Sequence, residues 1–175
     1  GHHYVAWCWD MGGSNANNTT GDIDSVVRAS QTYGQSIVTY TGTGTAGTIG
    51  HGLATAPDMI ILKRRNGDGG DTWPIFHSSI NAGWKIEFNT AAEADDLSNQ
   101  TFGNLPNSVT SSTFAVGDHA RANADGGTYV AYLFHAVTGY SAFGKYASNN
   151  NTTGPAIDTG FKPAFVMIKA HEGNS

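Results

Sequence analysis

The sequence contains few residues whose types and spacing could do chemistry together. Asp118 and His119 could form a hydrolytic triad with Ser111 or Ser112, because a carboxylate can orient the imidazole that activates a serine hydroxyl. Nothing in the surrounding sequence predicts the strained turn on which such a nucleophile is exposed. We therefore interpret Asp118-His119 as an adventitious pair on a loop.

Glu93 and Asp95 are two positions apart, which places both side chains on one face of a strand. Glycoside hydrolases use two carboxylates about 5–10 Å apart as acid and as base or nucleophile. A third acid, as in Glu-x-Asp-x-x-Glu, is missing here, and the alanine-rich surroundings indicate a surface loop. Glycoside hydrolysis remains an alternative, but we predict no catalytic residue.

Two loops match ion-binding or phosphate-binding patterns in part. Residues 66–71 carry oxygen ligands at calcium-like spacing, yet the twelfth position, which an EF-hand fills with Glu, is His77. Residues 42–47 match Gly-x-Gly-x-x-Gly, but the residues that follow cannot begin the helix that would bind a phosphate. We expect a solvated hairpin tip and a glycine-rich hairpin, with no metal and no cofactor.

Aromatic side chains are better candidates for a binding role, because their faces can stack on sugar rings. The candidate glycan-binding residues are Trp73, Trp84 and Tyr33. Trp84 alternates in phase with Ile86 and Phe88, which also fits a place in the core. Both interpretations of Trp84 stay open.

The composition limits the class of protein. The 175 residues suffice for one domain, or for one domain and a fragment of a second. A net charge of −5 argues against a nucleic-acid groove, and the longest apolar run, residues 59–62, is far too short to insert into a membrane. The single cysteine, Cys8, lies between two tryptophans and is expected to pack as a small hydrophobic residue.

The elements that must position these residues are strands. Short runs of β-branched and aromatic residues alternate with turn sequences, whereas helical patterning is confined to one turn at residues 91–97. The predicted strands are residues 4–9, 37–41, 59–63, 73–76, 84–88, 113–116, 129–134, 143–146 and 165–169. Residues 59–63 and 73–76 should form a hairpin, and residues 84–88 should place Lys and Glu on the face opposite Trp, Ile and Phe. We predict an all-β protein with an antiparallel, jelly-roll-like β-sandwich.

Parts of the chain repeat each other. Residues 4–9 read Tyr-Val-Ala-Trp-Cys-Trp and match residues 129–134, Tyr-Val-Ala-Tyr-Leu-Phe. The other matches follow in the same order: residues 37–41 with 143–147, Gly52-Leu53 with Gly160-Phe161, and residues 57–63 with 163–169, so that Tyr40 and Tyr146, like Pro57 and Pro163, are 106 positions apart. The shared order and spacing predict an internal repeat.

This repeat predicts the domain organisation. Residues 1–35 would be the end of a preceding repeat plus a connecting segment, residues 36–134 a full β-sandwich repeat, and residues 135–175 the truncated start of a following repeat. The chain would then be a window from a longer tandem protein. Its first and last strands should either pair with the central unit or lack partners.

The repeated sequences resemble a Gly/Thr-rich module of tailed-bacteriophage virion-surface and tail-fibre proteins, particularly those of marine and cyanobacterial phages. The stretches that carry the resemblance are residues 37–44, 49–53, 56–65, 126–134, 139–146 and 159–169. Such modules are similar to concanavalin-A-like jelly rolls. The motifs are strand ends and turns, and the resemblance transfers no catalytic residue to this chain.

The resemblance implies a non-enzymatic structural module at the virion surface, in a tail fibre or a capsid decoration. Its partners would be other copies of itself, as a homo-oligomer, or other virion proteins, and it could attach to the host surface. The main alternative is a lectin-like module that recognises host glycans, and a glycoside hydrolase or a cellular adhesin made of the same modules are further alternatives. We expect no nucleic acid among the partners and no insertion into a membrane.

Overall fold

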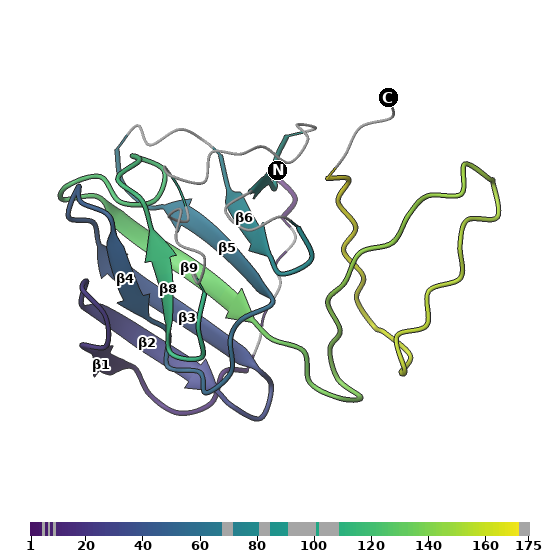
Figure 1. Ribbon diagram of the computed structural model, residues 1–175, viewed down its shortest axis with the longest axis horizontal. Helices are drawn as coiled ribbons and strands as arrows, with labels where there is room; N and C mark the ends of the chain where they lie inside the picture. Colours follow the sequence, from purple (N-terminus) through teal and green to yellow (C-terminus); the bar gives the residue numbers. More distant parts are fainter. Residues whose placement is uncertain are drawn as a thin grey trace.

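The computed structural model describes residues 1–4, 6, 8, 10–67, 72–80, 85–90, 101 and 109–171. Within these ranges the chain forms strands and no helix, so the predicted all-β class is confirmed (Figure 1). The strands are β1 (Ala16–Asn18), β2 (Ser25–Ser30), β3 (Gln35–Thr41), β4 (Gly47–Gly50), β5 (Met59–Arg64), β6 (Pro74–His77), β7 (Ile86–Glu87), β8 (Thr113–Val116) and β9 (Thr128–Phe134). It follows that no helix in the described part could cross a membrane.

The strands form two antiparallel sheets. The larger has the order β1-β2-β3-β9-β5-β6-β7, and the smaller pairs β4 with β8. The last strand, β9, lies at the centre of the larger sheet, where Phe134 is opposite both Gln35 of β3 and Met59 of β5. Strands β3 and β5 are far from β9 in the sequence, and β9 joins them in the sheet.

The core lies between the two sheets. Along β9 the inward residues Tyr129, Ala131 and Leu133 are fully buried, while their neighbours are half-buried, as alternation along a strand requires. Residues of the smaller sheet, such as Ile49 and Phe114, belong to the same buried cluster. Figure 1 shows β4 and β8 as a separate layer over the larger sheet, and this two-layer packing is that of a small β-sandwich.

A second apolar cluster lies on the opposite face of the larger sheet. Met59, Ile75 and Ile86 form it, and Phe134 and Phe143 pack against it. Both faces of β5 are therefore covered, which agrees with its almost continuous apolar sequence.

Several predicted strands are confirmed. The runs at residues 37–41, 59–63, 73–76, 113–116 and 129–134 coincide with strands to within a few residues. The predicted hairpin is present as well, since β5 pairs antiparallel with β6. Aromatic and β-branched residues with alternating burial mark these strands, and this pattern is the most reliable signal of a half-buried strand.

The strands predicted at the two ends of the chain are absent from the described residues there. Residues 143–146 and 165–169 have no strand structure, and residues after β9 leave the sheet and loop out at the right of Figure 1. In the N-terminal run, Tyr4, Ala6 and Cys8 are exposed and outside any strand, and the residues between them lie outside the described part. Cys8 does not pack as a small hydrophobic residue. A strand needs a partner for its backbone groups, and strand-like composition alone does not supply one.

The sequence did not predict β1, β2 and β4. Strand β2 pairs along its whole length with β3, and β4 pairs with β8. Gly47–Gly50 contains two glycines, which weaken its strand preference, and Ser25–Ser30 has two adjacent valines but no alternation of apolar and polar residues that would mark a strand. These strands form because a neighbouring strand offers hydrogen bonds to their backbone.

Candidate functional site

The structure separates the predicted glycan-binding residues. Trp73 is half-buried beside β6, with the ammonium group of Lys63 5.4 Å from its ring centre and the Phe88 ring at 6.4 Å. Its backbone N–H donates to Asn89 Oδ1 at 3.1 Å. The cation and the neighbouring ring already occupy part of the indole surface that a sugar would need.

Tyr33 is 42% exposed in the turn between β2 and β3, where its ring lies 5.2 Å from that of Tyr140. Gln35 Nε2 donates to the Tyr140 hydroxyl at 3.2 Å and fixes the pair. Gln35 is opposite Phe134 at one end of β9, whereas Lys63, beside Trp73, is opposite Val130 towards the other end. Tyr33 and Trp73 thus do not share one site, and Trp84 lies outside the described residues.

An open polar hollow of about 430 Å³ lies over the β1-β2-β3 side of the larger sheet. Amide, hydroxyl, carboxylate and guanidinium groups line it, including those of Asn17, Asp24, Thr39, Thr41, Arg65 and Thr128. Such a set offers donors and acceptors in several directions, as a polyol ligand requires. The hollow could not be foreseen from the sequence because β1 and β2, which form part of its wall, had not been predicted.

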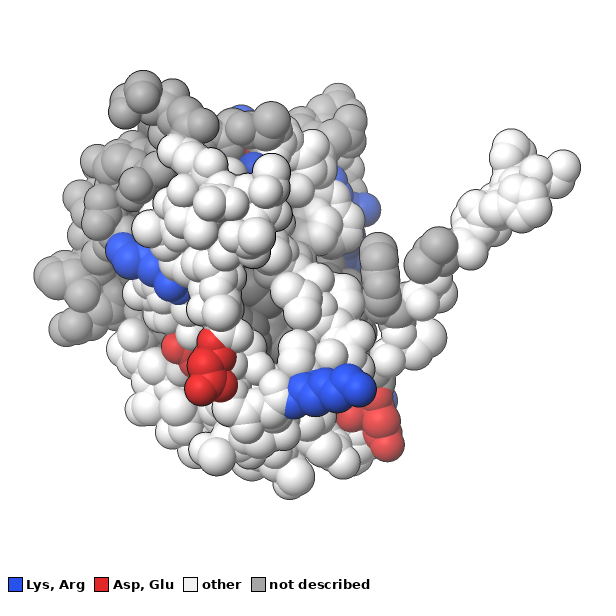
Figure 2. All heavy atoms as spheres, turned by 90° about the vertical axis from the view of Figure 1, so that its right-hand side faces the viewer, with Lys and Arg blue, Asp and Glu red and all other residues white. Residues whose placement is uncertain are grey.

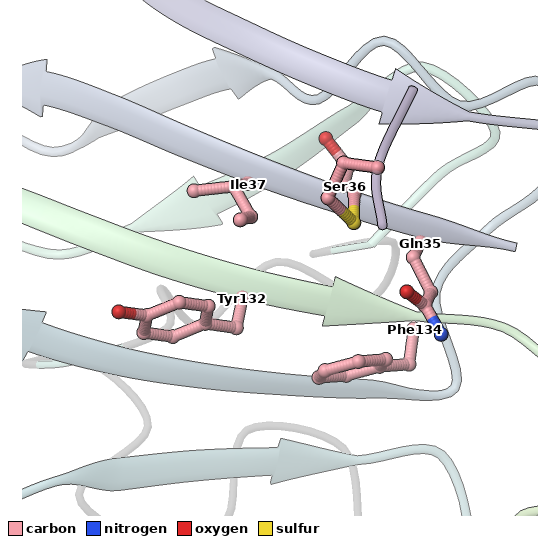
Figure 3. A pocket seen from close by; sticks show the side chains of 6 residues that line it. Gln35, Ser36, Ile37, Tyr132 and Phe134 are labelled. Atoms are coloured by element: carbon pink, nitrogen blue, oxygen red, sulfur yellow. The ribbon is translucent and has the colours of Figure 1, made fainter. Parts of the chain in front are cut away.

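A much smaller cavity lies under Met11 on the outer face of β3 and β9 (Figure 3). Its volume is about 10 Å³, at the lower limit for one water molecule. Met11 is buried there against Ile37, Tyr132 and Phe134. This contact covers one end of the sheet with apolar side chains, and it has no room for a ligand.

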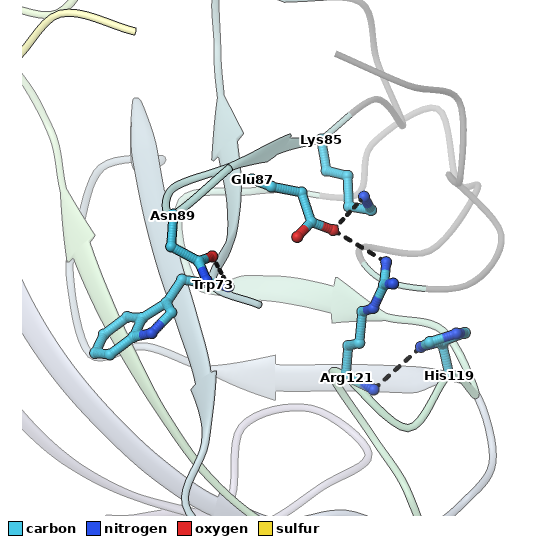
Figure 4. Close-up of polar contacts among 6 residues, drawn as sticks. All are labelled: Trp73, Lys85, Glu87, Asn89, His119 and Arg121. Atoms are coloured by element: carbon cyan, nitrogen blue, oxygen red, sulfur yellow. Dashed lines mark hydrogen bonds and ion pairs between the residues drawn. The ribbon is translucent and has the colours of Figure 1, made fainter. Parts of the chain in front are cut away.

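A buried charged cluster joins β7 to the segment before β9 (Figure 4). Glu87 Oε1 accepts from Lys85 Nζ at 2.8 Å and from Arg121 NH1 at 3.0 Å. Lys85 and Glu87 are almost completely buried, although charged side chains usually lie at the surface. Lys and Glu two positions apart lie on the same face of a strand, so the sequence is compatible with the Lys85–Glu87 ion pair. The pairing of Glu87 with Arg121 could not be foreseen, because the two residues are far apart in the sequence.

This cluster is a network of ion pairs. The described residues contain no group of three or more His, Cys, Asp or Glu side chains that could hold a metal ion. Glu87 Oε2 is buried and has no hydrogen-bond partner there. Lys85 and Arg121 share one carboxylate oxygen of Glu87, so replacing Glu87 would remove the counter-ion that both cations contact.

The structure does not join His119 to the serines of the hypothetical triad. His119 Nδ1 accepts the backbone N–H of Arg121 at 3.1 Å. Partial burial, with the nearby Arg121 guanidinium, lowers the pKa of His119. No hydrogen bond connects its ring to Ser111 or Ser112 among the described residues, and both serines are exposed. The arrangement offers no activated nucleophile.

Asn66, the first residue of the 66–71 loop, uses its side chain in hydrogen bonds to the backbone. Asn66 Oδ1 accepts the Thr128 N–H at 2.7 Å, and its Nδ2 donates to the Gly126 carbonyl at 3.5 Å. Asn66 thereby ties the end of β5 to the turn before β9. Residues 68–71 lie outside the described part, as do Glu93 and Asp95.

His51 is a buried residue that the sequence analysis did not single out. Its Nδ1 accepts the Leu53 N–H at 3.1 Å, so Nε2 carries the proton and donates to the Thr110 carbonyl at 3.2 Å. Burial lowers the pKa of His51, and His135 adds to this effect. The imidazole is a neutral cross-link between the β4–β5 connection and the residues before β8.

No curated protein and no solved structure matches the chain. The sequence model of one family, described as "Domain of unknown function (DUF7483)", matches residues 1–175. The chain belongs to this family.

Proposed function

We propose that the protein is a non-enzymatic structural module of a phage virion-surface protein, in a tail fibre or capsid decoration, and that it mediates assembly. The observation that carries this proposal is a continuous apolar stretch in the extended C-terminal segment. Phe165, Val166 and Ile168 are between 63% and 68% exposed. A contiguous exposed apolar stretch is typical of a surface that binds another protein.

The surrounding surface supports this proposal. Figure 2 shows the side from which the C-terminal segment extends, where charged side chains are few and most of the coloured surface is uncharged. A chain with 13% charged residues presents little charge that must be desolvated when subunits pack together. The resemblance to phage modules provides the virion location, the jelly-roll topology and the repeat organisation that complete the proposal.

Electron microscopy of the purified native particle tests the proposed function. We expect a repeating fibre, or modules that stud a capsid, with antibodies against this chain binding along them. The same specimens show whether copies of the chain contact each other or other virion proteins. A compact soluble monomer with no particle attached would overturn the proposal.

A second candidate function is recognition of host glycans, and the polar hollow over β1, β2 and β3 favours it. We expect binding on a glycan array to be lost on Asp24→Ala, because the carboxylate lines the hollow. Asp158→Ala removes an exposed carboxylate from the C-terminal segment and serves as the matched control. An array without hits for the native chain would count against this second function and leave the structural role in place.

A further inference from the structure

The polar hollow on the larger sheet contains a row of side chains that crosses four neighbouring strands. At its middle, Thr41 at the end of β3 is opposite Thr128 at the start of β9. Arg65 directly follows β5, and its backbone N–H donates to the Thr128 carbonyl at 2.7 Å. Asp24 directly precedes β2, whose first residue is opposite the residue before Thr41. This polar row therefore runs, in order, Asp24, Thr41, Thr128 and Arg65.

The polar row lies on the face of the sheet that is turned away from the smaller sheet. Neighbouring residues of a strand point to opposite faces, and Tyr40 and Tyr129, the neighbours of Thr41 and Thr128, belong to the core between the sheets. All four members of the row line the same hollow. Three of them are exposed and Thr128 is half-buried, so a molecule in solution can reach the whole row.

The side chains of the polar row are not bonded to other side chains of the protein. Within the described residues, the Asp24 carboxylate and the Arg65 guanidinium form no ion pair and no hydrogen bond. The hydroxyl groups of Thr41 and Thr128 form none there either. On the core side of β3, by contrast, the Tyr40 hydroxyl donates to a backbone carbonyl at 2.6 Å. The row thus presents donors and acceptors that solvent or a ligand can use.

The backbone under the row is fixed by its own hydrogen bonds. Asn66 Oδ1 accepts the Thr128 N–H at 2.7 Å. Gly42, which follows β3, donates to the Gly127 carbonyl at 2.7 Å and accepts the Gly126 N–H at 3.1 Å. The end of β3, the end of β5 and the turn before β9 are therefore tied together. A ligand meets backbone positions that are set before it binds, which lowers the entropic cost of binding.

The two charges lie at opposite ends of the row. Asp24 is beside β2 and Arg65 is beside β5, with β3 and β9 between them (Figure 1). Neighbouring strands are about 4.8 Å apart, so three strand spacings separate the two backbone positions by about 14 Å. A ligand that contacts both ends is longer than one sugar ring. It needs an anionic group at one end and hydroxyl groups at the other.

We propose that the polar row binds an oligosaccharide that has one acidic sugar over Arg65 and neutral sugars over Thr41 and Asp24. A guanidinium group binds a carboxylate through two parallel N–H bonds, and the Asp24 carboxylate accepts hydroxyl groups of the neutral sugars. Val26, which is 38% exposed and lines the hollow, offers an apolar contact to a sugar ring. The inference rests on the second candidate function, glycan recognition, and specifies its ligand and the direction in which it lies.

The same order of charges argues against a uniformly anionic polymer. A nucleic acid or a polyuronate carries a negative charge on every unit, so one of these charges would lie beside Asp24 and be repelled. The net charge of −5 provides no basic surface to offset that repulsion. An oligosaccharide with a single acidic sugar places its charge only at the Arg65 end.

Matched glycans on an array test the inference with the full chain. Each pair differs only in a terminal acidic sugar, as sialyllactose differs from lactose. We expect the native chain to bind the acidic member of one or more pairs more tightly. Arg65→Gln should weaken binding of that member about tenfold or more and leave the neutral member unchanged, because a charge-assisted contact is lost. Asp24→Ala should abolish binding of both members.

Two further variants separate the geometry of the contact from net charge. Arg65→Lys keeps the charge but lacks the planar guanidinium group, so its affinity for the acidic member should fall between those of the native chain and Arg65→Gln. Lys162→Gln removes one positive charge from the exposed C-terminal segment and should bind like the native chain. Circular dichroism checks that every variant keeps the native strand content.

The possible results distinguish the inference from the function on which it rests. Equal binding of both members by the native chain, or a preference for the acidic member that survives in Arg65→Gln, would overturn the inference and leave glycan recognition in place. An equal loss of the preference in Lys162→Gln would assign it to net charge and also overturn the inference. An array on which no glycan binds would reject both and leave the structural role untouched.

Discussion

At the scale of single residues, buried polar side chains hold the connections between strands. His51 joins two connections through both ring nitrogens, and Glu87 gathers Lys85 and Arg121. Tyr40 and Tyr129 are stacked 5.1 Å apart, and each hydroxyl donates to a backbone carbonyl in the 120–122 segment. These contacts are costly to break because the groups left behind stay buried without partners.

His51 predicts how stability depends on pH. Burial lowers the pKa of His51 below its unfolded value of 6.5, so the unfolded chain binds more protons as the pH falls. We therefore expect the free energy of unfolding, measured by urea denaturation, to fall as the pH drops through 6.5. His77 and His119, whose pKa values are also lowered mainly by burial, act in the same direction.

The variant His51→Gln should lose about 1–3 kcal/mol of stability at pH 7, because a buried donor or acceptor loses its partner. Its stability should also decline less steeply between pH 7 and pH 5. The exposed His3→Gln is the control and should reproduce the native curve. An unchanged slope in His51→Gln would contradict the account of a neutral, buried imidazole.

At the scale of elements, the alternation of apolar and polar side chains along the sequence allowed several strands to be predicted. The Tyr129, Ala131 and Leu133 positions of β9 follow the inward pattern of their sequence, and β5 reads as a strand covered on both faces. The pairing partners could not be foreseen. Gly47–Gly50 becomes a strand only because β8 lies beside it, whereas the stronger sequence at residues 165–169 remains outside any strand.

The candidate site was predicted less well than the strands. Tyr33 and Trp73 were chosen for their residue type, but their separation follows from sheet order, which no local pattern contains. The sequence pattern placed Lys85 and Glu87 on one face of a strand but did not show that this face is buried, because the ion pair of Glu87 with Arg121 joins distant parts of the chain. Long-range pairing is the information that a single sequence lacks.

Strand β5 and residues 163–169, which repeat its sequence, predict opposite responses to the same kind of truncation. Leu62→Ala removes a fully buried side chain and should lower the free energy of unfolding by about 2–5 kcal/mol. Ile168→Ala removes an exposed one and should change it by less than about 0.5 kcal/mol in dilute solution. Thermal unfolding of both variants measures the difference, and equal losses would show that residues 165–169 are packed in the single copy.

At the scale of the whole molecule, a closed two-sheet body and an extended C-terminal segment should differ in local stability. We expect amide hydrogen exchange to be slowest in β9, which is bonded on both sides, and fast in residues 144–168 of dilute protein. Raising the protein concentration should slow exchange in that segment if copies assemble through it. Uniform protection of both regions at low concentration would contradict this division.

The central position of β9 also has a consequence in time. Strands β3 and β5 are complete long before residues 128–134 leave the ribosome, and contacts between such distant parts of a chain form slowly. Until then β3 and β5 of the growing chain lack the strand that pairs with both of them in the folded protein. Before that point the edges of β3 and β5 that later pair with β9 are open to non-native pairing, so the interval between the synthesis of β5 and that of β9 is the stage at which this sheet is most exposed to mispairing.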